Sequence, residues 1–511
     1  MDENTRNLAD LLRQPDPGRT ALIFRDSSLT WSELDARVDR FAAALHELGL
    51  AEGDRVALAL GNGLDFPVVY FGTLRAGLVA VPVNPGFTAR ELGHVLGDSG
   101  AAALVGGPLV AEAVEDVRGA LPNLRHVLGT GPALADLLDA APATPPPTTR
   151  GGEDLAVLIY TSGTSGRPKG AMLSHRALLA NLDQCSRIEP PPLTSDDTVL
   201  LVLPLFHIYG LGPGLGQAAM AGATAVIGER FDPVATLGLI GQHGVTNVPG
   251  APPMYVAWSL LPGFAEAFKG VRTAVCGADQ LPADAQERLR EATGHYVYEG
   301  YGLTETAPVL TSTLMSERPK TGSIGRPVPG VELRLFDVAA GEYVDPDDDE
   351  DSDPGEIEVR GGNLFSGYWP DGSGGPDADG WWRTGDVAYA DEDGDLFLVD
   401  RIRELILVSG FNVYPREVED VLATHPSIAE AAVIGAPHPY TGETVRAFVV
   451  AVPGAELTAE DVIAHCERGL ARFKCPSSVD VVARLPHSAT GKVSKGLLRK
   501  AALRGLDPSE V

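Results

Sequence analysis

The sequence predicts an α/β protein, with a large N-terminal domain of layered α/β subdomains that includes a β-barrel-like antiparallel portion, followed by a small α+β domain. Three observations lead to this fold class. Strand-like apolar runs alternate with amphipathic helix patterns from residue 20 onward, which is typical of layered, largely parallel sheets. Short alternating runs separated by Gly and Asp occupy residues 330–400. Alternation of helices and strands returns after residue 401.

Residues 20–60 contain the first unit of this pattern. The apolar run ALIF is followed by Thr30-x-x-Glu33, a capping box that marks the start of a helix. Gly49 ends this helix, and the run VALAL follows as a strand. The apolar residues of the expected helix recur at helical spacing, at Leu34, Val38, Phe41, Leu45 and Leu48.

Segment 330–400 has a different character. The runs GVELRLFD, GEIEVRG and GDLFLVD are typical of antiparallel strands joined by turns. The acidic run at 345–353 predicts a solvated loop, because like charges at that density repel one another. We place a domain boundary near Arg403, which divides the chain into domains of residues 1–402 and 403–511.

The charge balance limits the classes of partner. The chain of 511 residues carries 40 Lys and Arg against 69 Asp and Glu, a net charge of −29, and its hydrophobic content is 44%. This composition is typical of a soluble globular protein, and its far field repels nucleic acid and anionic membrane surfaces. Any site for a phosphate group therefore has to create its positive potential locally.

Cysteine usage and the N-terminal sequence favour a cytoplasmic protein. The four cysteines show no C-x-x-C spacing, so we expect neither a zinc site nor a disulfide framework. The N-terminus lacks the pattern of a secretory signal. Residues 199–228 contain no charged side chain, but prolines and glycines interrupt them, so we expect a buried strand, turn and helix there and no transmembrane segment.

A segment rich in glycine and hydroxyl groups, TSGTSGRPKG at 161–170, has the composition of a phosphate cradle. Its glycines allow close approach of the backbone, and its hydroxyls and lysine supply donors. It differs from the motif G-x-x-x-x-G-K-[ST], because Pro168 precedes the lysine and Gly170 follows it. A flexible surface loop is the alternative. The residues that we assign to phosphate binding are Thr161, Ser162, Gly163, Thr164, Ser165 and Lys169.

Further motifs follow this segment in order. They are PLFHIYG (204–210), CGADQLP (276–282), YEGYGLTET (298–306), WWRTGDVAYADEDGDLFLVDR (381–401), SGFNVYPREVE (409–419) and ATGKVSK (489–495). Together they resemble the adenylate-forming superfamily of acyl-CoA synthetases, nonribosomal peptide adenylation domains and beetle luciferases, over nearly the whole chain. The resemblance implies that a carboxylate couples to the α-phosphate of ATP, that pyrophosphate leaves, and that the acyl group then passes to a thiol such as that of coenzyme A.

The resemblance also implies an ATP site with Mg²⁺. In it the 161–170 loop holds the β- and γ-phosphates, Glu305 binds Mg²⁺ through the hard oxygen donor that this ion prefers, and Thr304 contacts the α-phosphate. Asp386 and Arg401 resemble the contacts to the ribose hydroxyls. Out of context, Glu305 could cap a helix and Asp386 could form a turn. The residues expected along adenine and the adjoining wall are Gly277, Ala278, Glu299, Gly300 and Tyr301.

The C-terminal domain is expected to be mobile. Lys492 resembles the lysine that reaches the acyl carboxylate and the α-phosphate, where it would add positive potential to that of Lys169 and Mg²⁺. Rotation about a hinge at Arg403, where the family commonly has Lys or Asp, would withdraw Lys492 and open a path for the thiol. The candidate contacts to coenzyme A are Arg230, Gly410 and Lys474, of which the two cations could otherwise be solvated surface charges.

The acyl pocket is expected around His207, Tyr209 and Gly277, although a hydrogen-bonded core histidine is the alternative for His207. The motif at 204–210 has no acid to pair with the ammonium of an amino acid. The expected wall at 247–261 has no arginine for malonate and is apolar. We therefore expect a medium- to long-chain fatty acid as the substrate.

Other functions remain as alternatives. An aryl acid such as cinnamate, coumarate or benzoate is the second candidate, because PLFHIYG also occurs in coumarate-CoA ligases, although Leu407 and Ser409 stand where the plant ligases carry lysines. An adenylation enzyme that loads an acyl carrier protein and a non-catalytic nucleotide-binding module are further alternatives. The expected partners are a small carboxylic acid, ATP and coenzyme A, without nucleic acid, and a homodimer is left open.

Overall fold

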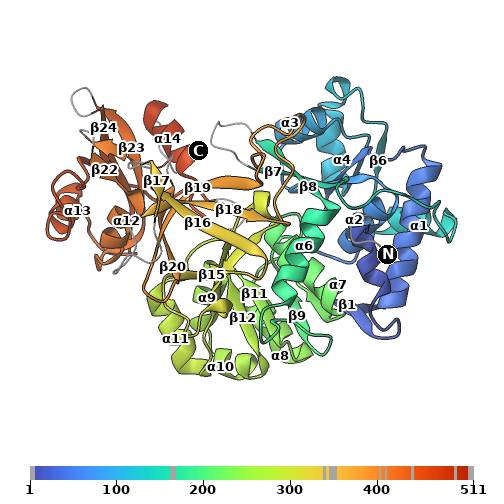
Figure 1. The fold of residues 1–511 in the computed structure, drawn as a ribbon, viewed down its shortest axis with the longest axis horizontal. Helices are drawn as coiled ribbons and strands as arrows, with labels where there is room; N and C mark the ends of the chain where they lie inside the picture. The colour runs from blue at the N-terminus through green and yellow to red at the C-terminus, as the bar shows by residue number, and fades with distance from the viewer. Residues whose placement is uncertain are drawn as a thin grey trace. The chain divides into compact units, whose positions relative to one another are not determined.

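The computed structural model describes residues 6–161, 168–337, 341–344, 354–401, 404, 406–408, 411–438, 442–487 and 492–504 (Figure 1). The chain forms two compact units. Unit 1 comprises Met1–Glu332 and Arg360–Trp382, and unit 2 comprises Leu333–Val359 and Arg383–Val511. The mixed α/β class is as the sequence predicts. The proposed boundary at 403 stays a prediction, and Arg403 itself lies outside the described residues.

The first sheet of unit 1 has the strand order β6-β5-β3-β4-β7-β8, in which β8 alone among the described strands runs antiparallel to its neighbour. Its strands are β3 (Arg55–Ala59), β4 (Val79–Pro82), β5 (Ala103–Gly106), β6 (His126–Leu128), β7 (Leu155–Thr161) and β8 (Lys169–Ser174). The helices in this part of the chain are α1 (Trp31–Glu47), α2 (Asp65–Arg75), α3 (Ala89–Ser99), α4 (Pro108–Glu115), α5 (Pro132–Ala140) and α6 (His175–Ser186).

The second sheet of unit 1 runs β15-β14-β13-β12-β11-β9-β10-β1-β2, with a parallel middle and antiparallel ends. Its strands are β1 (Thr20–Phe24), β2 (Ser27–Thr30), β9 (Thr198–Leu201), β10 (Thr224–Ile227), β11 (Asn247–Gly250), β12 (Thr273–Cys276), β13 (Tyr298–Gly302), β14 (Val309–Ser312) and β15 (Ser323–Pro327). The helices of this region are η4 (Gly210–Gly216), α7 (Gln217–Ala221), α8 (Pro233–His243), α9 (Pro252–Ser259), α10 (Phe264–Ala267), α11 (Ala283–Thr293) and the single turn η6 (Thr304–Thr306).

The uncharged segment 199–228 forms a strand, a π-helical turn, a helix and a second strand, namely β9, η4, α7 and β10. The buried strand, turn and helix predicted from its prolines and glycines are therefore present. Among the described residues, no helix is both long and apolar enough to span a bilayer.

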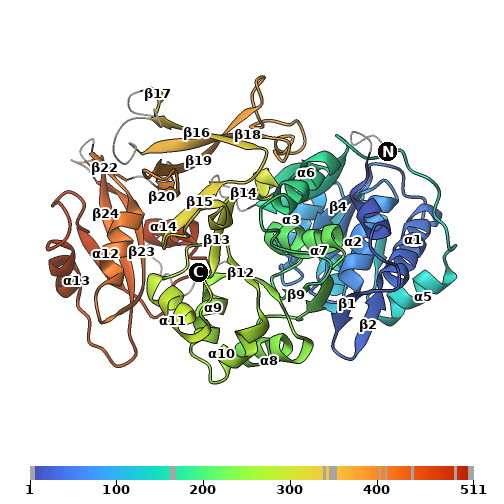
Figure 2. The same cartoon turned by 60° about the horizontal axis from the view of Figure 1, so that its bottom comes forward.

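Unit 2 contains the predicted antiparallel strands and the C-terminal sheet. The segments predicted at 330–337, 355–361 and 394–400 form β16 (Val331–Asp337), β18 (Gly355–Gly361) and β20 (Leu396–Arg401), accompanied by β17 (Glu342–Tyr343) and β19 (Trp381–Ala390). The C-terminal sheet has the order β22-β21-β24-β23, with β25 beside β24. Its elements are β21 (Ile406–Val408), β22 (Phe411–Val413), α12 (Pro415–Ala423), β23 (Ile428–His438), β24 (Gly442–Ala451), α13 (Ala459–Cys466), β25 (Ser478–Val481) and α14 (Lys495–Arg504). Both α12 and α14 pack on β23 (Figure 2).

Helix α1 begins at the predicted capping box. Thr30 Oγ1 accepts a hydrogen bond from the Glu33 amide at 3.2 Å, and Glu33 Oε2 accepts one from the Thr30 amide at 2.7 Å. Four of the five predicted apolar residues are buried, whereas Leu48 is half-buried just after the helix. Phe41 packs so closely on α2 that a Cβ at Gly72 would lie 2.8 Å from the Phe41 ring. The absence of a side chain at this glycine therefore sets the spacing of α1 and α2.

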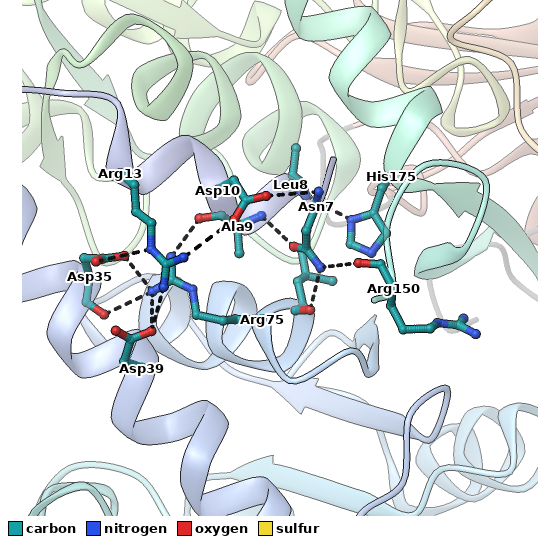
Figure 3. Close-up of polar contacts among 11 residues, drawn as sticks. Asn7, Leu8, Ala9, Asp10, Arg13, Asp35, Asp39, Arg75, Arg150 and His175 are labelled. Carbon is teal, nitrogen blue, oxygen red and sulfur yellow. Dashed lines mark hydrogen bonds and ion pairs between the residues drawn. The ribbon is translucent and has the colours of Figure 1, made fainter. Parts of the chain in front are cut away.

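A buried arginine ties the N-terminal turn, η2 (Leu8–Arg13), to these two helices (Figure 3). Arg75, at the end of α2, is 6% exposed and forms ion pairs with Asp35 at 2.6 Å and Asp39 at 2.9 Å on α1. Its Nη2 also donates to the Ala9 carbonyl at 2.8 Å. A charge in this position is stable because both carboxylates and the carbonyl satisfy it.

The start of η2 is held by hydrogen bonds from the Asn7 side chain and the Leu8 amide. Asn7 Nδ2 donates to the carbonyls of Leu74 at 2.9 Å and Arg150 at 3.0 Å. The Leu8 amide donates to Nδ1 of His175 at 3.1 Å (Figure 3). Burial lowers the pKa of His175 to about 4, which keeps the ring neutral and its Nδ1 available as the acceptor.

Replacement of the buried arginine tests this network. We expect Arg75→Ala to lower the free energy of unfolding by about 3 kcal/mol, because it leaves Asp35 and Asp39 without their buried partner. Urea unfolding monitored by circular dichroism measures the loss. The matched control is Arg13→Ala. Arg13 approaches Asp39 at 3.2 Å but is 52% exposed, so its loss should cost less than about 1 kcal/mol. Equal costs for the two variants would contradict this assignment.

Candidate active site

The predicted phosphate loop is the connection between β7 and β8. Thr161 and Lys169 are direct partners in the register of this antiparallel pair, so they lie opposite each other where the loop leaves the sheet. Ser162, Gly163, Thr164 and Ser165 lie outside the described residues. β8 packs closely on β7 directly after Lys169, because a Cβ at Gly170 would lie 2.8 Å from Cδ1 of Leu158.

Tyr368 joins the loop lysine to the predicted magnesium ligand. Its hydroxyl donates to Glu305 Oε1 at 2.7 Å, and its ring lies under Lys169, with Nζ 5.3 Å from the ring centre. Lys169 forms no ion pair with any described residue, and its ammonium lies over an aromatic face. The sequence motifs did not identify Tyr368, which follows a glycine in the segment FSGYW and carries no distinctive local signal.

Glu305 lies in η6, which packs on β8. It is 8% exposed, and the Phe365 amide donates to its carbonyl at 2.9 Å. Oε1 is fixed by Tyr368, whereas Oε2 accepts no hydrogen bond from any residue that the structure describes. One oriented oxygen and one available oxygen on a nearly buried carboxylate fit a hard cation such as Mg²⁺.

The backbone around η6 is closely packed. A Cβ at Gly302 would lie 1.8 Å from the Pro308 carbonyl oxygen, so only glycine fits at the end of β13. Ala307 adopts a left-handed conformation with φ +66°. Asn363 Nδ2 donates to the Thr306 carbonyl at 2.8 Å. Thr304 is half-buried in the same turn, beside Glu305. The motif YEGYGLTET thus folds into a strand end and one rigid turn.

The residues expected near adenine lie on β13 and after β12. The carboxylate of Glu299 is buried, and its Oε2 accepts a hydrogen bond from the Leu281 amide at 3.0 Å, which ties β13 to the CGADQLP segment. Ala278 in that segment has a left-handed backbone, with φ +72°. Gly300 and Tyr301 follow on β13, and Tyr301 is half-buried. Glu299 therefore orients the neighbouring segment.

The residues expected near the acyl group come together. The Tyr209 hydroxyl donates to the Val275 carbonyl at 3.1 Å, and a Cβ at Gly277 would lie 3.0 Å from the Tyr209 ring. The Tyr209 amide donates to His207 Nδ1 at 3.2 Å, so the neutral ring carries its proton on Nε2. Burial lowers the pKa of His207 to about 4, which makes the neutral form the one present near pH 7.

Unit 2 carries the predicted ribose contacts. Asp386 on β19 and Arg401 on β20 are direct partners in the antiparallel register, and Asp386 is 4% exposed. The Asp386 amide donates to Thr384 Oγ1 at 3.1 Å, and the Thr384 hydroxyl donates to the Ile357 carbonyl at 3.0 Å. The strand pairing therefore brings together two residues that the motifs placed 15 positions apart.

The remaining predicted residues have different surroundings. Lys492 is exposed at the start of the segment that leads into α14. Lys474 donates to both carboxylate oxygens of Glu417 on α12, at 2.6 and 2.7 Å, so its charge is already paired. Arg230 is exposed after β10. Gly410, like Arg403, lies outside the described residues.

Comparison with known proteins identifies the family. A model of the AMP-binding enzyme family matches residues 12–369, and a model of the AMP-binding enzyme C-terminal domain matches residues 417–492. A feruloyl-CoA synthase from Amycolatopsis sp is 38% identical over 95% of this chain and 96% of its own length. A long-chain-fatty-acid--CoA ligase from Yersinia pestis is 37% identical over 94% of this chain and 91% of its own.

A solved structure agrees with the same assignment. The ATP-bound MatB of Rhodopseudomonas palustris superposes with a TM-score of 0.89 at 33% identity, over 97% of this chain and 98% of that chain. The resemblance noted in the sequence is thereby confirmed, and the chain belongs to the AMP-binding enzyme family of adenylate-forming ligases.

Proposed function

We propose that this protein is an AMP-forming acyl-CoA synthetase that activates a medium- to long-chain fatty acid. The observation that carries the proposal is the arrangement of Lys169, Tyr368 and Glu305 beside the phosphate loop. It offers a cation that has no ion-pair partner among the described residues and an oriented carboxylate, both in contact with one tyrosine. These are the features that binding of a magnesium–triphosphate complex requires.

The reaction has two steps. In the first, a carboxylate oxygen of the acid attacks the α-phosphorus of ATP, the bond to pyrophosphate breaks, and an acyl-adenylate forms. In the second, the thiol sulfur of coenzyme A attacks the acyl carbon, AMP leaves, and the thiol proton passes to solvent. Lys169 attracts the phosphate tail, and the Nε2–H of neutral His207 donates to the carboxylate of the acid. Lys492 stabilises the charge that develops between the two anions. Glu305 would hold Mg²⁺, which would compensate the negative charge of the phosphate oxygens.

The surroundings of the expected pocket support an uncharged acyl group. Tyr255 and Trp258 on α9 are completely buried, as is Val248 on β11, and segment 247–261 contains no charged side chain. An isolated carboxylate or ammonium on the substrate would find no partner on this wall. The long-chain-fatty-acid--CoA ligase relative is consistent with an aliphatic acid.

An aryl acid is the second candidate, because one relative is named feruloyl-CoA synthase and the wall includes aromatic rings. The Tyr209 ring lies against Gly277, and the edge of Trp258 meets Tyr255 with ring centres 5.6 Å apart. The Tyr209 ring, which is partly exposed, offers a flat surface on which an aromatic substrate can pack. An acyl carrier protein in place of coenzyme A is the alternative acceptor.

A substrate screen tests the proposal directly. We expect pyrophosphate release with fatty acids of medium and long chain, because each buried methylene adds about 0.8 kcal/mol of binding. Benzoate, cinnamate, malonate and amino acids are the comparison set, and coenzyme A and an acyl carrier protein are compared as acceptors. Faster release with an aryl acid would favour the second candidate, and no release with any acid would refute the enzyme assignment.

Lys492, which precedes α14, should serve only the first step. We expect Lys492→Ala to lower adenylate formation by more than about a hundredfold, because a charge aimed at the transition state is lost. Thioester formation from supplied acyl-adenylate should stay near the native rate. ATP–pyrophosphate exchange and a thioester assay measure the two steps. Lys500→Ala, on the exposed side of α14, is the matched control. Equal loss in both steps would contradict this role.

The hydroxyl of Tyr368 should set the requirement for Mg²⁺. Tyr368→Phe keeps the ring under Lys169 but removes the hydrogen bond to Glu305, so we expect roughly a tenfold rise in the Mg²⁺ concentration needed for half-maximal ATP–pyrophosphate exchange. Tyr343→Phe is the control, because Tyr343 is 47% exposed on β17. An unchanged Mg²⁺ requirement in Tyr368→Phe would show that this hydroxyl does not orient a metal ligand.

A further inference from the structure

The turn that leads into Asp386 is held by two consecutive residues of β18. Glu356 Oε1 accepts a hydrogen bond from the Gly385 amide at 3.2 Å. The Ile357 carbonyl accepts one from the Thr384 hydroxyl at 3.0 Å, and the Thr384 oxygen accepts one from the Asp386 amide at 3.1 Å. The backbone on the N-terminal side of Asp386 is therefore positioned by β18, which lies beside β19 in the sheet (Figure 2).

The conformation of Gly385 gives the hydrogen bond from its amide a particular importance. Its backbone has φ +78°, in the left-handed region that glycine enters at little cost. A glycine leaves this region as readily as it enters it, so its own preference does not fix the peptide plane that leads into Asp386. The carboxyl group of Glu356 fixes that plane from outside, because it accepts the N–H.

Ion pairing does not account for an acidic residue at position 356. Side chains alternate along a strand, so Glu356 and Glu358 lie on the same face of β18. Glu358 is 2.6 Å from Arg334 and 3.3 Å from Arg383. Glu356 approaches Arg383 only to 3.7 Å, and the Arg383 side chain is 45% exposed. The neighbouring glutamate therefore has the closer ion pairs, whereas Glu356 has the contact with the turn.

The position of Glu356 is costly for the fold. Glu356 is 7% exposed. Burial raises its pKa, Arg383 and the Gly385 N–H lower the pKa, and the charges of Glu358 and Asp386 raise it again. A nearly buried carboxyl group beside two others costs stability, and such an arrangement is typical of functional sites.

We propose that Glu356 is a positioning residue for Asp386, which it orients toward the ribose of ATP through the Gly385 amide. The proposal rests on the ribose contact expected of Asp386, and so on the nucleotide-binding part of the proposed function. Asp386 is 4% exposed, so water does not readily replace a ribose hydroxyl that its oxygens fail to reach. A rotation of the Gly385 peptide would therefore weaken the selection of a nucleotide that carries both hydroxyls.

Nucleotide binding in the absence of any acid tests this role in the full-length protein. The dissociation constants of ATP and of 2′,3′-dideoxy-ATP are measured by isothermal titration calorimetry with Mg²⁺ present. The dideoxy nucleotide lacks both ribose hydroxyls, so the ratio of the two constants reports the ribose contact alone. We expect the wild type to prefer ATP by about tenfold or more, as for hydrogen bonds to a charged acceptor, and Asp386→Ala to lose most of this preference.

Two substitutions of Glu356 separate its hydrogen bond from its volume. Glu356→Met fills a similar space but offers no carboxyl oxygen to the Gly385 amide. It should lower the preference for ATP by about threefold to fivefold and leave the dissociation constant of the dideoxy nucleotide within about twofold. Glu356→Gln keeps an oxygen that accepts the N–H, so it should retain the preference within about twofold. A loss of folded protein alone would affect both nucleotides equally.

Glu358→Gln is the matched control. Glu358 is similarly buried on the same strand, but its side-chain hydrogen bonds to described residues come from Arg334 and Arg383. This variant should keep the preference for ATP, whatever its melting temperature. If Glu356→Met does not fold, Thr384→Val removes the second connection to β18 and should lower the preference by a similar factor. An unchanged preference in Thr384→Val would then overturn the positioning of Asp386 by β18.

The outcomes distinguish this inference from the proposed function. A wild type that prefers ATP to the dideoxy nucleotide but releases pyrophosphate with no acid would overturn the proposed enzyme and leave the role of Glu356 standing. Equal binding of the two nucleotides by the wild type would overturn this inference, whether or not an acid is activated. A preference that requires Asp386 but is complete in Glu356→Met, or is lost as much in Glu356→Gln as in Glu356→Met, would overturn the positioning role alone.

Discussion

Positive charge has to be concentrated locally in this protein, because its net charge is −29 and its reaction joins two anions. Several arginines do not supply that charge, because they form ion pairs within the fold. Examples are the pairs Arg75–Asp35, Arg272–Asp197 and Arg334–Glu358. The chain has few lysines, and most of them lie in or near the segments that the family motifs mark. They are Lys169, Lys269, Lys320, Lys474, Lys492, Lys495 and Lys500.

Tyr368 contacts both Lys169 and Glu305, so the lysine and the carboxylate need not pair directly. A lysine and a carboxylate that both serve a magnesium–triphosphate complex attract each other, and a direct ion pair between them would neutralise both. The phenol keeps the two functions apart, because its ring face holds Lys169 and its hydroxyl holds Glu305. The cation–π contact fixes the ammonium without cancelling its charge. The hydrogen bond orients one carboxylate oxygen and leaves the other available for the Mg²⁺ that we propose there.

Local sequence rules predicted the parts of the fold that depend on neighbouring residues. The capping box of α1, the buried strand and turn at 199–228 and the antiparallel strands after residue 330 all depend on patterns within a few positions. Tyr368 could not be found in this way, because it meets Glu305 across 63 residues of sequence. The pairing of Lys474 with Glu417 was missed for the same reason, since it depends on how α12 packs. Motif order predicted Asp386 and Arg401 as ribose contacts, and only the strand register shows that they lie opposite each other.

Under the proposed mechanism, the two half-reactions depend on different parts of the chain. A change at Lys169 or Glu305 would act on the nucleotide itself, so it would affect every state in which the phosphates are bound. A change at Lys492 would act only in the adenylation step. The helix that follows Lys492 is held within unit 2, because Lys495 in the first turn of α14 pairs with Glu404 at 3.1 Å and with Glu419 at 2.8 Å. The position of Lys492 along the chain is therefore set by ion pairs that do not involve the nucleotide site of unit 1.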